Sequence, residues 1–223
     1  FQVNLPDNWN RKAIHFGGAG FNGNVVTATG PAPRGGEPPL NRGYVTLGSD
    51  SGHPAALGPT FGLNDEALEN YAHAAIKKVH DVAVALMRAR YGAAPEHFYF
   101  AGNSKGGHEA MMAMQRYPED YDGIIAFHPV YNMIGTGLAP VEYAKQIFRA
   151  GESGNYPGFL SRAKGAMLNA AVIEACDSND GLKDGIISDP GACRFDPAKL
   201  RCPGGADQGD HCLSDEQIKS VLS

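Results

Sequence analysis

The chain has 223 residues, of which 43% are apolar and 19% charged, and this composition excludes a disordered or fibrous protein. Its formal net charge of −5, with no basic cluster, argues against nucleic acid or an anionic membrane surface as a partner. No apolar stretch approaches the roughly 20 residues that span a bilayer, and the length suggests one domain with an insertion or two small domains.

The first 130 residues alternate short apolar runs with amphipathic stretches. Buried strands are expected at 13–16, 43–48, 97–101 and 123–127, and helices at 64–91 and 105–117. Asn64 is the expected N-cap of the longer helix, and Gly92 is expected to end it. Strands that alternate with helices predict an α/β fold with a parallel-type sheet flanked by helices.

After Pro129 the pattern changes, because helices are expected at 141–150 and 161–175 with no strand between them. We therefore predict an α/β core over 1–130 and a mostly helical, loop-rich insertion over 131–223. All the cysteines follow in this second part: Cys176, Cys193, Cys202 and Cys212. An even number of clustered cysteines without CxxC pairs favours two disulfides and a secreted or periplasmic location; four buried free thiols are the alternative.

The sharpest motif is Gly102-Asn103-Ser104-Lys105-Gly106, a G-x-S-x-G sequence between a predicted strand and a predicted helix. This is the context in which a serine becomes an exposed nucleophile on an abrupt strand-to-helix turn. The flanking glycines permit the turn, and the helix N-terminus provides partial positive charge. The alternative is a Ser/Gly-rich turn that only caps the helix.

A glycine-rich loop, Gly17-Gly18-Ala19-Gly20, follows the first predicted strand. An oxyanion hole for Ser104 needs two main-chain donors, and the N–H of Lys105 is the expected first one. The second is expected from Gly18 or Ala19, and the sequence does not choose between them. A plain tight loop is the alternative, and phosphate binding is disfavoured because the GxGxxG spacing is absent.

A catalytic serine also needs a histidine base and an acid that orients it, and in this fold both follow the serine along the chain. The downstream histidines are His108, His128 and His211, and none lies at a late strand-to-loop junction. We therefore expect the acid and the histidine in a C-terminal segment or companion chain beyond residue 223.

An acidic segment, CDSNDGLKDGII, covers residues 176–187. Asp177, Asp180 and Asp184 would repel one another unless a cation is bound, and Ca²⁺ favours carboxylate and carbonyl oxygens. The spacing is not that of an EF-hand. A solvated acidic turn is the alternative.

Five ordered segments resemble the tannase and feruloyl esterase family of α/β-hydrolases, and the likeness covers essentially the whole chain. They are LPDNWNRKAIHFGGAGFNG, GYVTLGSDSGH, FYFAGNSKGGHEAMMAMQRYPEDYDGIIAFHP, CDSNDGLKDGIISDPGACRFDP and the run from Cys202 to CLSDEQ. The resemblance implies a calcium site made by the side chains of Asp177, Asp180 and Asp184 and the main-chain oxygens of Leu182 and Ile186. It also implies the disulfides Cys176–Cys193 and Cys202–Cys212, and an insertion that serves as a lid over the active site.

The chain departs from the family pattern at the nucleophile. Asn103 stands where the family usually has a cysteine bonded to another cysteine beside the catalytic histidine, so that tether is absent. Lys105 occupies a position expected to face the site, where a cation could attract a substrate carboxylate. His211-Cys212 mimics the family's His-Cys pair but lies in the lid segment, so we do not expect it to be catalytic.

The leading hypothesis is a serine esterase that cleaves small-molecule esters, and the resemblance implies aromatic acid esters such as feruloyl or galloyl esters. The alternative is a calcium-stabilised, non-catalytic module whose remaining catalytic residues are absent or lie on another chain. An acyltransferase or a peptidase on the same core is a weaker third interpretation.

Overall fold

The computed structural model describes residues 1–30, 36–151 and 154–223. Within them the chain forms two compact units, Phe1–Asn132 and Met133–Ser223, here called the N-terminal and C-terminal units. The division falls close to the predicted boundary near residue 130, while the assignment of the C-terminal unit as a lid stays a prediction.

The N-terminal unit contains a five-stranded sheet in the order β1-β3-β2-β4-β5. Its strands are β1 (Gln2–Asn4), β2 (Lys12–Phe16), β3 (Val45–Gly48), β4 (His97–Asn103) and β5 (Gly123–Phe127). The strands β2, β3, β4 and β5 pair in parallel, which confirms the predicted α/β architecture. The sheet is nonetheless mixed, because β1 adds an antiparallel edge that a three-residue strand is too short to reveal as a sequence pattern.

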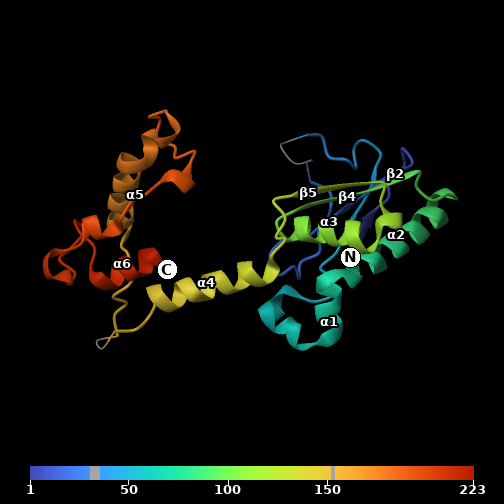
Figure 1. Cartoon of the computed structure of the whole chain (residues 1–223). Coiled ribbons are helices and arrows are strands. Elements are labelled where there is room, and N and C mark those ends of the chain that lie inside the picture. Colours follow the sequence, from blue (N-terminus) through green and yellow to red (C-terminus); the bar gives the residue numbers. More distant parts are fainter. Residues whose placement is uncertain (31–35, 152–153) are drawn as a thin grey trace. The chain divides into compact units, whose positions relative to one another are not determined.

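Two helices, α2 (Ala75–Tyr91) and α3 (Lys105–Arg116), pack on the same face of this sheet (Figure 1). Alternate strand residues such as Ala13, Leu47 and Phe100 point to that face and meet helix residues such as Ala83 and Ala110. This period of two is what a sheet with one helix-covered face requires. The hydrophobic core therefore lies directly under the strand that leads to Ser104.

The helix expected over 64–91 has its predicted ends but not a uniform interior. Asn64 accepts a hydrogen bond from the Ala67 N–H at 2.9 Å, and Gly92 ends the helix with φ 74°. Between these ends, α1 (Asp65–Glu69) is joined to α2 by one π-helical turn over Asn70–Ala74. Such a turn inserts one extra residue into the helical repeat, which the apolar spacing did not reveal.

The C-terminal unit contains α4 (Met133–Ile147), α5 (Arg162–Cys176) and α6 (Asp215–Leu222), joined by irregular segments and short 3₁₀ turns. The expected start of α4 at residue 141 is wrong, because the helix begins eight residues earlier and includes Pro140. No helix was expected at α6, which begins at a capping box formed by Ser214 and Gln217.

Both disulfides have the predicted partners. Cys176 bonds to Cys193, and Cys202 bonds to Cys212, with Cα–Cα distances of 5.3 and 5.0 Å. All four cysteines lie among the described residues and none of them is free, so the alternative of four buried thiols is wrong.

Candidate active site

Ser104 lies at the junction between β4 and α3 and is exposed. Its φ of 58° and ψ of −116° place a non-glycine residue in a backbone region that ordinarily costs about 1–3 kcal/mol. Its N–H donates to the Phe127 carbonyl of β5 at 3.0 Å, which fixes the turn to the neighbouring strand. A Cβ on Gly102 would come within 2.0 Å of the Gly106 oxygen, so the glycines on both sides allow the turn to close.

The glycine loop that follows β2 packs against this turn. A Cβ on Gly17 would lie 2.6 Å from the Gly106 Cα, and a Cβ on Gly106 would lie 2.7 Å from the Gly18 oxygen. Such contacts require residues without side chains on both segments. Because β2 and β4 are parallel neighbours, their carboxyl ends bring the loop and Ser104 to the same edge of the sheet.

The structure does not favour Gly18 as the second oxyanion donor. Its N–H donates to the Glu109 carboxylate at 2.8 Å, so this hydrogen is already engaged. Of the two residues that the sequence left open, Ala19 is therefore the better candidate. The N–H of Lys105 lies at the first position of α3, where main-chain donors have no partner within the helix.

The side chain of Lys105 does not face the site as expected. It is 2% exposed, and its Nζ donates to the Tyr71 carbonyl at 2.9 Å and lies 3.4 Å from Glu109 Oε1. Burial lowers the pKa of this ammonium, and the negative charge of Glu109 opposes that shift. The suggestion that Lys105 attracts a substrate carboxylate is therefore wrong, because the cation already has partners in the interior.

Two of the three downstream histidines bond to groups other than the Ser104 hydroxyl. His108 Nδ1 donates to the Val130 carbonyl at 2.8 Å, and His128 Nδ1 lies 3.2 Å from Asn103 Oδ1. His211 is exposed in the C-terminal unit. These contacts give His108 and His128 partners other than Ser104, and that none of the three histidines is the catalytic base stays a prediction.

Two upstream histidines have structural partners. His15 belongs to β2 and its side chain is buried; its Nδ1 lies 3.0 Å from the Tyr121 hydroxyl, and burial lowers its pKa to about 3. His53 Nε2 donates to the Phe21 carbonyl at 2.8 Å, and its ring stacks on Phe61. The segment that ends in His53 therefore holds the far end of the glycine loop.

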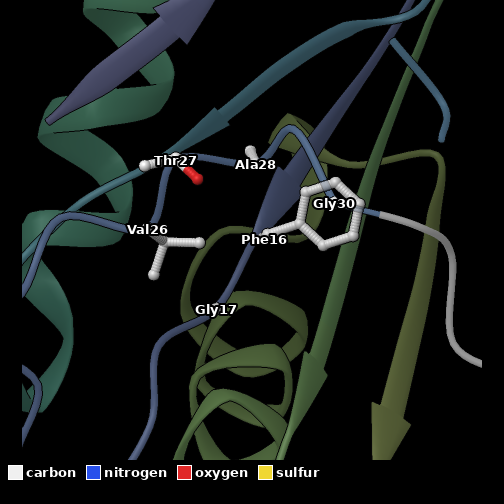
Figure 2. Close-up of a pocket in the computed structure, with 6 residues that line it drawn as sticks. All are labelled: Phe16, Gly17, Val26, Thr27, Ala28 and Gly30. Carbon is white, nitrogen blue, oxygen red and sulfur yellow. The ribbon is translucent and has the colours of Figure 1, made fainter. Parts of the chain in front are cut away.

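A cavity of about 400 Å³ lies beside the glycine loop (Figure 2). Its described lining residues are Phe16, Gly17, Val26, Thr27, Ala28 and Gly30. Figure 2 shows the Phe16 ring next to Gly30 and across from Val26. Ser104 is not among these residues, so this cavity neighbours the candidate active site without containing its nucleophile.

The acidic loop presents oxygen donors that fit a hard cation by their chemistry, but it does not gather them into a formed cage. Asp177 is buried and accepts the Gly185 N–H at 2.9 Å, while Asp184 accepts the Ile186 N–H at 3.0 Å. Asp180 accepts the N–H groups of Leu182 and Ser188, and these bonds lower its pKa. Among the described residues, the group of three possible ligand atoms within 4.8 Å of one another lies elsewhere, at His80, Asp81 and Asp120.

That second cluster already has a cation. Lys77 Nζ lies 2.5 Å from Asp81 Oδ1 and 3.2 Å from Asp120 Oδ2. His80 Nδ1 lies 3.0 Å from the same Asp81 oxygen. The cluster joins α2 to the turn over Pro118–Asp120, and no local sequence pattern indicates it, because Asp120 is far along the chain from Lys77, His80 and Asp81.

A model of the family described as tannase and feruloyl esterase matches residues 1–223. The chain belongs to the tannase and feruloyl esterase family. It is 33% identical over 247 residues to the mono(2-hydroxyethyl) terephthalate hydrolase of Piscinibacter sakaiensis, covering 99% of this chain and 41% of that protein. It is 37% identical over 232 residues to an uncharacterized esterase of Agrobacterium fabrum, covering 100% of this chain and 41% of the relative.

The solved structure of feruloyl esterase B from Aspergillus oryzae superposes with a TM-score of 0.77 at 28% identity. The superposition covers 98% of this chain and 42% of the feruloyl esterase chain. The chain thus spans about two fifths of the length of the relatives that it matches. Within the described residues, no helix combines the length and the apolar character needed to cross a bilayer.

Proposed function

We propose that the chain provides the nucleophile and the oxyanion hole of a serine esterase in the tannase and feruloyl esterase family. One observation carries the proposal: an exposed serine with φ 58° stands between β4 and α3, with a glycine loop packed against its turn. The esterase and hydrolase names of the relatives support the same reaction class.

In the proposed reaction, Ser104 Oγ forms a bond to the ester carbonyl carbon while a histidine outside residues 1–223 takes the serine proton. The N–H groups of Lys105 and Ala19 stabilise the negative oxygen of the tetrahedral intermediate. The intermediate collapses, the alcohol leaves with the proton from the histidine, and the acyl group stays on Ser104. Water, deprotonated by the same histidine, then attacks the acyl carbon. The bond from this carbon to Ser104 Oγ breaks, the serine oxygen takes the proton back from the histidine, and the acid is released.

We expect esters of aromatic acids as substrates, such as feruloyl or galloyl esters, because the family that the chain matches is described as tannase and feruloyl esterase and a relative carries the name feruloyl esterase. The acid and histidine of the triad would come from a C-terminal segment or companion chain. The relatives are long enough to contain such a segment, since this chain matches about two fifths of them.

The proposal includes Ca²⁺ bound by Asp177, Asp180 and Asp184 and by the main-chain oxygens of Leu182 and Ile186. Its support is the chemistry of five oxygen donors in a short loop and the burial of one carboxylate, Asp177, which costs free energy without a counter-charge. The ion would stabilise the loop and take no part in the ester reaction. The two disulfides support an oxidising location, secreted or periplasmic.

The test uses the full-length protein and its Ser104→Ala variant. An organophosphonate should label the wild-type protein stoichiometrically at Ser104, as mass spectrometry of the peptide would show. Hydrolysis of methyl ferulate should fall by about 10⁴- to 10⁶-fold in Ser104→Ala, because the acyl-enzyme can no longer form. Ser220→Ala, on α6, is the matched control and should keep wild-type activity. A serine that stays unlabelled, with no hydrolysis, would instead favour the non-catalytic, calcium-stabilised module.

A further inference from the structure

Glu109 is a buried acid one helical turn beyond the nucleophile, and the proposed reaction does not use it. It lies on α3 and is 5% exposed. Its Oε2 accepts the Gly18 N–H at 2.8 Å, and its Oε1 accepts Asn22 Nδ2 at 2.6 Å and the Ser51 hydroxyl at 3.4 Å. Three segments that are distant in sequence therefore meet at one carboxylate.

Lys105 supplies the counter-charge that this carboxylate needs in the interior. Its Nζ lies 3.4 Å from Glu109 Oε1, and both side chains are almost fully buried. A buried charge is costly unless it is paired and hydrogen-bonded, and this pair meets both conditions. The same ammonium also lies 4.1 Å from the centre of the Tyr71 ring, which adds a cation–π contact.

Tyr71 connects the pair to the glycine loop at a further point. Its carbonyl accepts from Lys105 at 2.9 Å, and its hydroxyl donates to the Gly20 carbonyl at 3.2 Å. Burial, followed by the charge of Glu109, raises the pKa of Tyr71 to about 12, so the hydroxyl keeps its proton and remains a donor. The glycine loop is thus held at Gly18 and Gly20, and Asn22, two residues beyond it, is held as well.

These anchors matter because the loop itself is rich in glycine. Glycine leaves the backbone free to adopt many conformations, so the position of the Ala19 N–H depends on contacts outside the loop. The helix that carries Glu109 begins directly after Ser104, and therefore links the loop to the nucleophile. A displacement of about 1 Å in a catalytic group lowers a rate by on the order of 100-fold.

We infer that Glu109 positions the glycine loop so that its oxyanion donor faces Ser104, and that Lys105 keeps this buried carboxylate charged. The inference rests on the proposed function. Glu109 does not touch the ester, so it is a positioning residue. Its hold on the Gly18 N–H also explains why the neighbouring Ala19 is left as the candidate donor.

The central variant is Glu109→Gln in the full-length protein. Glutamine has almost the same shape but replaces one acceptor oxygen by an NH₂ group, so the loop loses one of its anchors. We expect kcat for methyl ferulate to fall by about 10- to 100-fold while KM changes by less than about 2-fold, because the oxyanion exists only in the transition state.

A second readout separates positioning from stability. Phenylboronic acid forms a tetrahedral adduct with a catalytic serine and so requires the oxyanion donors. Its Ki should weaken in Glu109→Gln by about the same factor as kcat/KM falls. A role in stability alone would lower Tm and the fraction of active protein but leave this Ki unchanged. Asp120→Asn is the matched control, since it removes a partly buried, ion-paired acid elsewhere in the same unit.

Asn22→Gly provides an independent test on the loop side of the same contact. Asn22 has φ 59°, which glycine adopts freely, and the substitution removes the 2.6 Å bond to Glu109 without changing α3. It should lower kcat and boronate affinity together, by a smaller factor than Glu109→Gln. If Glu109→Gln does not fold, this variant decides the question.

The outcomes separate the inference from the proposed function. A wild-type protein that neither hydrolyses the ester nor reacts at Ser104 would overturn the proposed function. An active wild type whose Glu109→Gln and Asn22→Gly variants keep kcat and boronate affinity would overturn the positioning role alone. Parallel losses in both variants, with Asp120→Asn unchanged, support it.

Discussion

Among the described residues, each of the two units buries one lysine, but the surroundings of these lysines differ. Lys105 of the N-terminal unit lies beside a core of strand and helix side chains, and its ion-pair partner Glu109 is also buried. Lys164 of the C-terminal unit pairs with Asp207 at 2.8 Å, and that carboxylate is 52% exposed. Lys164 also donates to Gln217 Oε1 at 2.7 Å.

The difference extends to the whole interior of each unit. The N-terminal unit buries large apolar side chains, including Leu47, Met87 and Phe100, and contains no cysteine. Among the described residues of the C-terminal unit, the buried apolar side chains are Leu213, Pro197 and three half-cystines. Small apolar cores rarely supply enough stability alone, so disulfides and polar networks are expected to replace hydrophobic burial there.

This contrast has a consequence for function. In the N-terminal unit, stability comes from burial, and the Glu109–Lys105 pair is available to position the candidate active site. In the C-terminal unit, the comparable polar network of Lys164, Asp207 and Gln217 connects α5 to α6 and contributes to stability itself. The role of a buried ion pair therefore depends on whether other interactions already stabilise the unit around it.

Reduction of the disulfides should give the largest difference between the units. The two bridges close loops with sequence separations of 17 and 10 residues. Loops of this size correspond to about 3 kcal/mol each in the chain-entropy account. Hydrogen exchange followed by mass spectrometry should show that α5 and α6 lose protection under dithiothreitol while β4 and α3 keep theirs. Equal loss in both units would show that the disulfides do not stabilise the C-terminal unit selectively.

Removal of calcium should give the next largest effect, again confined to the C-terminal unit. A ligand present at 100 times its Kd contributes about 2.7 kcal/mol, so EDTA should lower the Tm of this unit by several degrees and added Ca²⁺ should restore it. Asp180→Asn should lower Tm in Ca²⁺ but add little in EDTA, because the lost ligand matters only when the ion is bound.

Glu174→Gln is the control for that experiment, since it removes an exposed acid of α5 outside the loop. It should leave the calcium-dependent part of Tm unchanged. Calcium binding would be refuted by a Tm that does not respond to EDTA. The difference in Tm between the wild type and Asp180→Asn could also be equal with and without the ion. This result would mean that Asp180 acts only through its bonds to Leu182 and Ser188.

Much of the N-terminal fold could be predicted because its signals are local. The apolar runs, the Asn64 cap and the Gly92 terminus each reflect physical preferences within a few residues. The strand β1 was not predicted because three residues are too few to show an alternating pattern. The early start of α4 was not predicted because Pro140 normally marks the beginning of a helix.

The residues of the candidate site also divide into those with a local sequence signal and those without one. Ser104 was visible because the turn between strand and helix imposes glycines at fixed spacing. Glu109 was not, because a single acid on a helix looks like a solvated surface residue, and its partners Gly18 and Asn22 are 91 and 87 residues away. The misjudged direction of the Lys105 side chain has the same cause, since Glu109 and Tyr71 determine it only in the folded chain.

The last and smallest effect concerns pH. Lys164, the Gly209 N–H and Gln217 lower the pKa of Asp207, so this carboxylate stabilises the folded unit above its unfolded pKa of about 3.9. The contribution is lost as pH falls through the lower folded pKa. Lys164→Met should lower the free energy of unfolding by about 1–2 kcal/mol at pH 6. The effect is modest because Asp207 is half exposed and water weakens its ion pair. The difference from wild type should shrink as pH approaches 3, because protonated Asp207 no longer pairs with Lys164.

Lys219→Met is the matched control for this measurement, because its ion pair with Glu216 is exposed on both sides. Exposed pairs contribute about 0–1 kcal/mol, so thermal unfolding of this variant should stay close to wild type at both pH values. A Lys164→Met effect that does not depend on pH would show that Lys164 stabilises the unit through packing and the Gln217 bond. The ion pair with Asp207 would then contribute nothing, and the two buried lysines would differ even more than their contacts indicate.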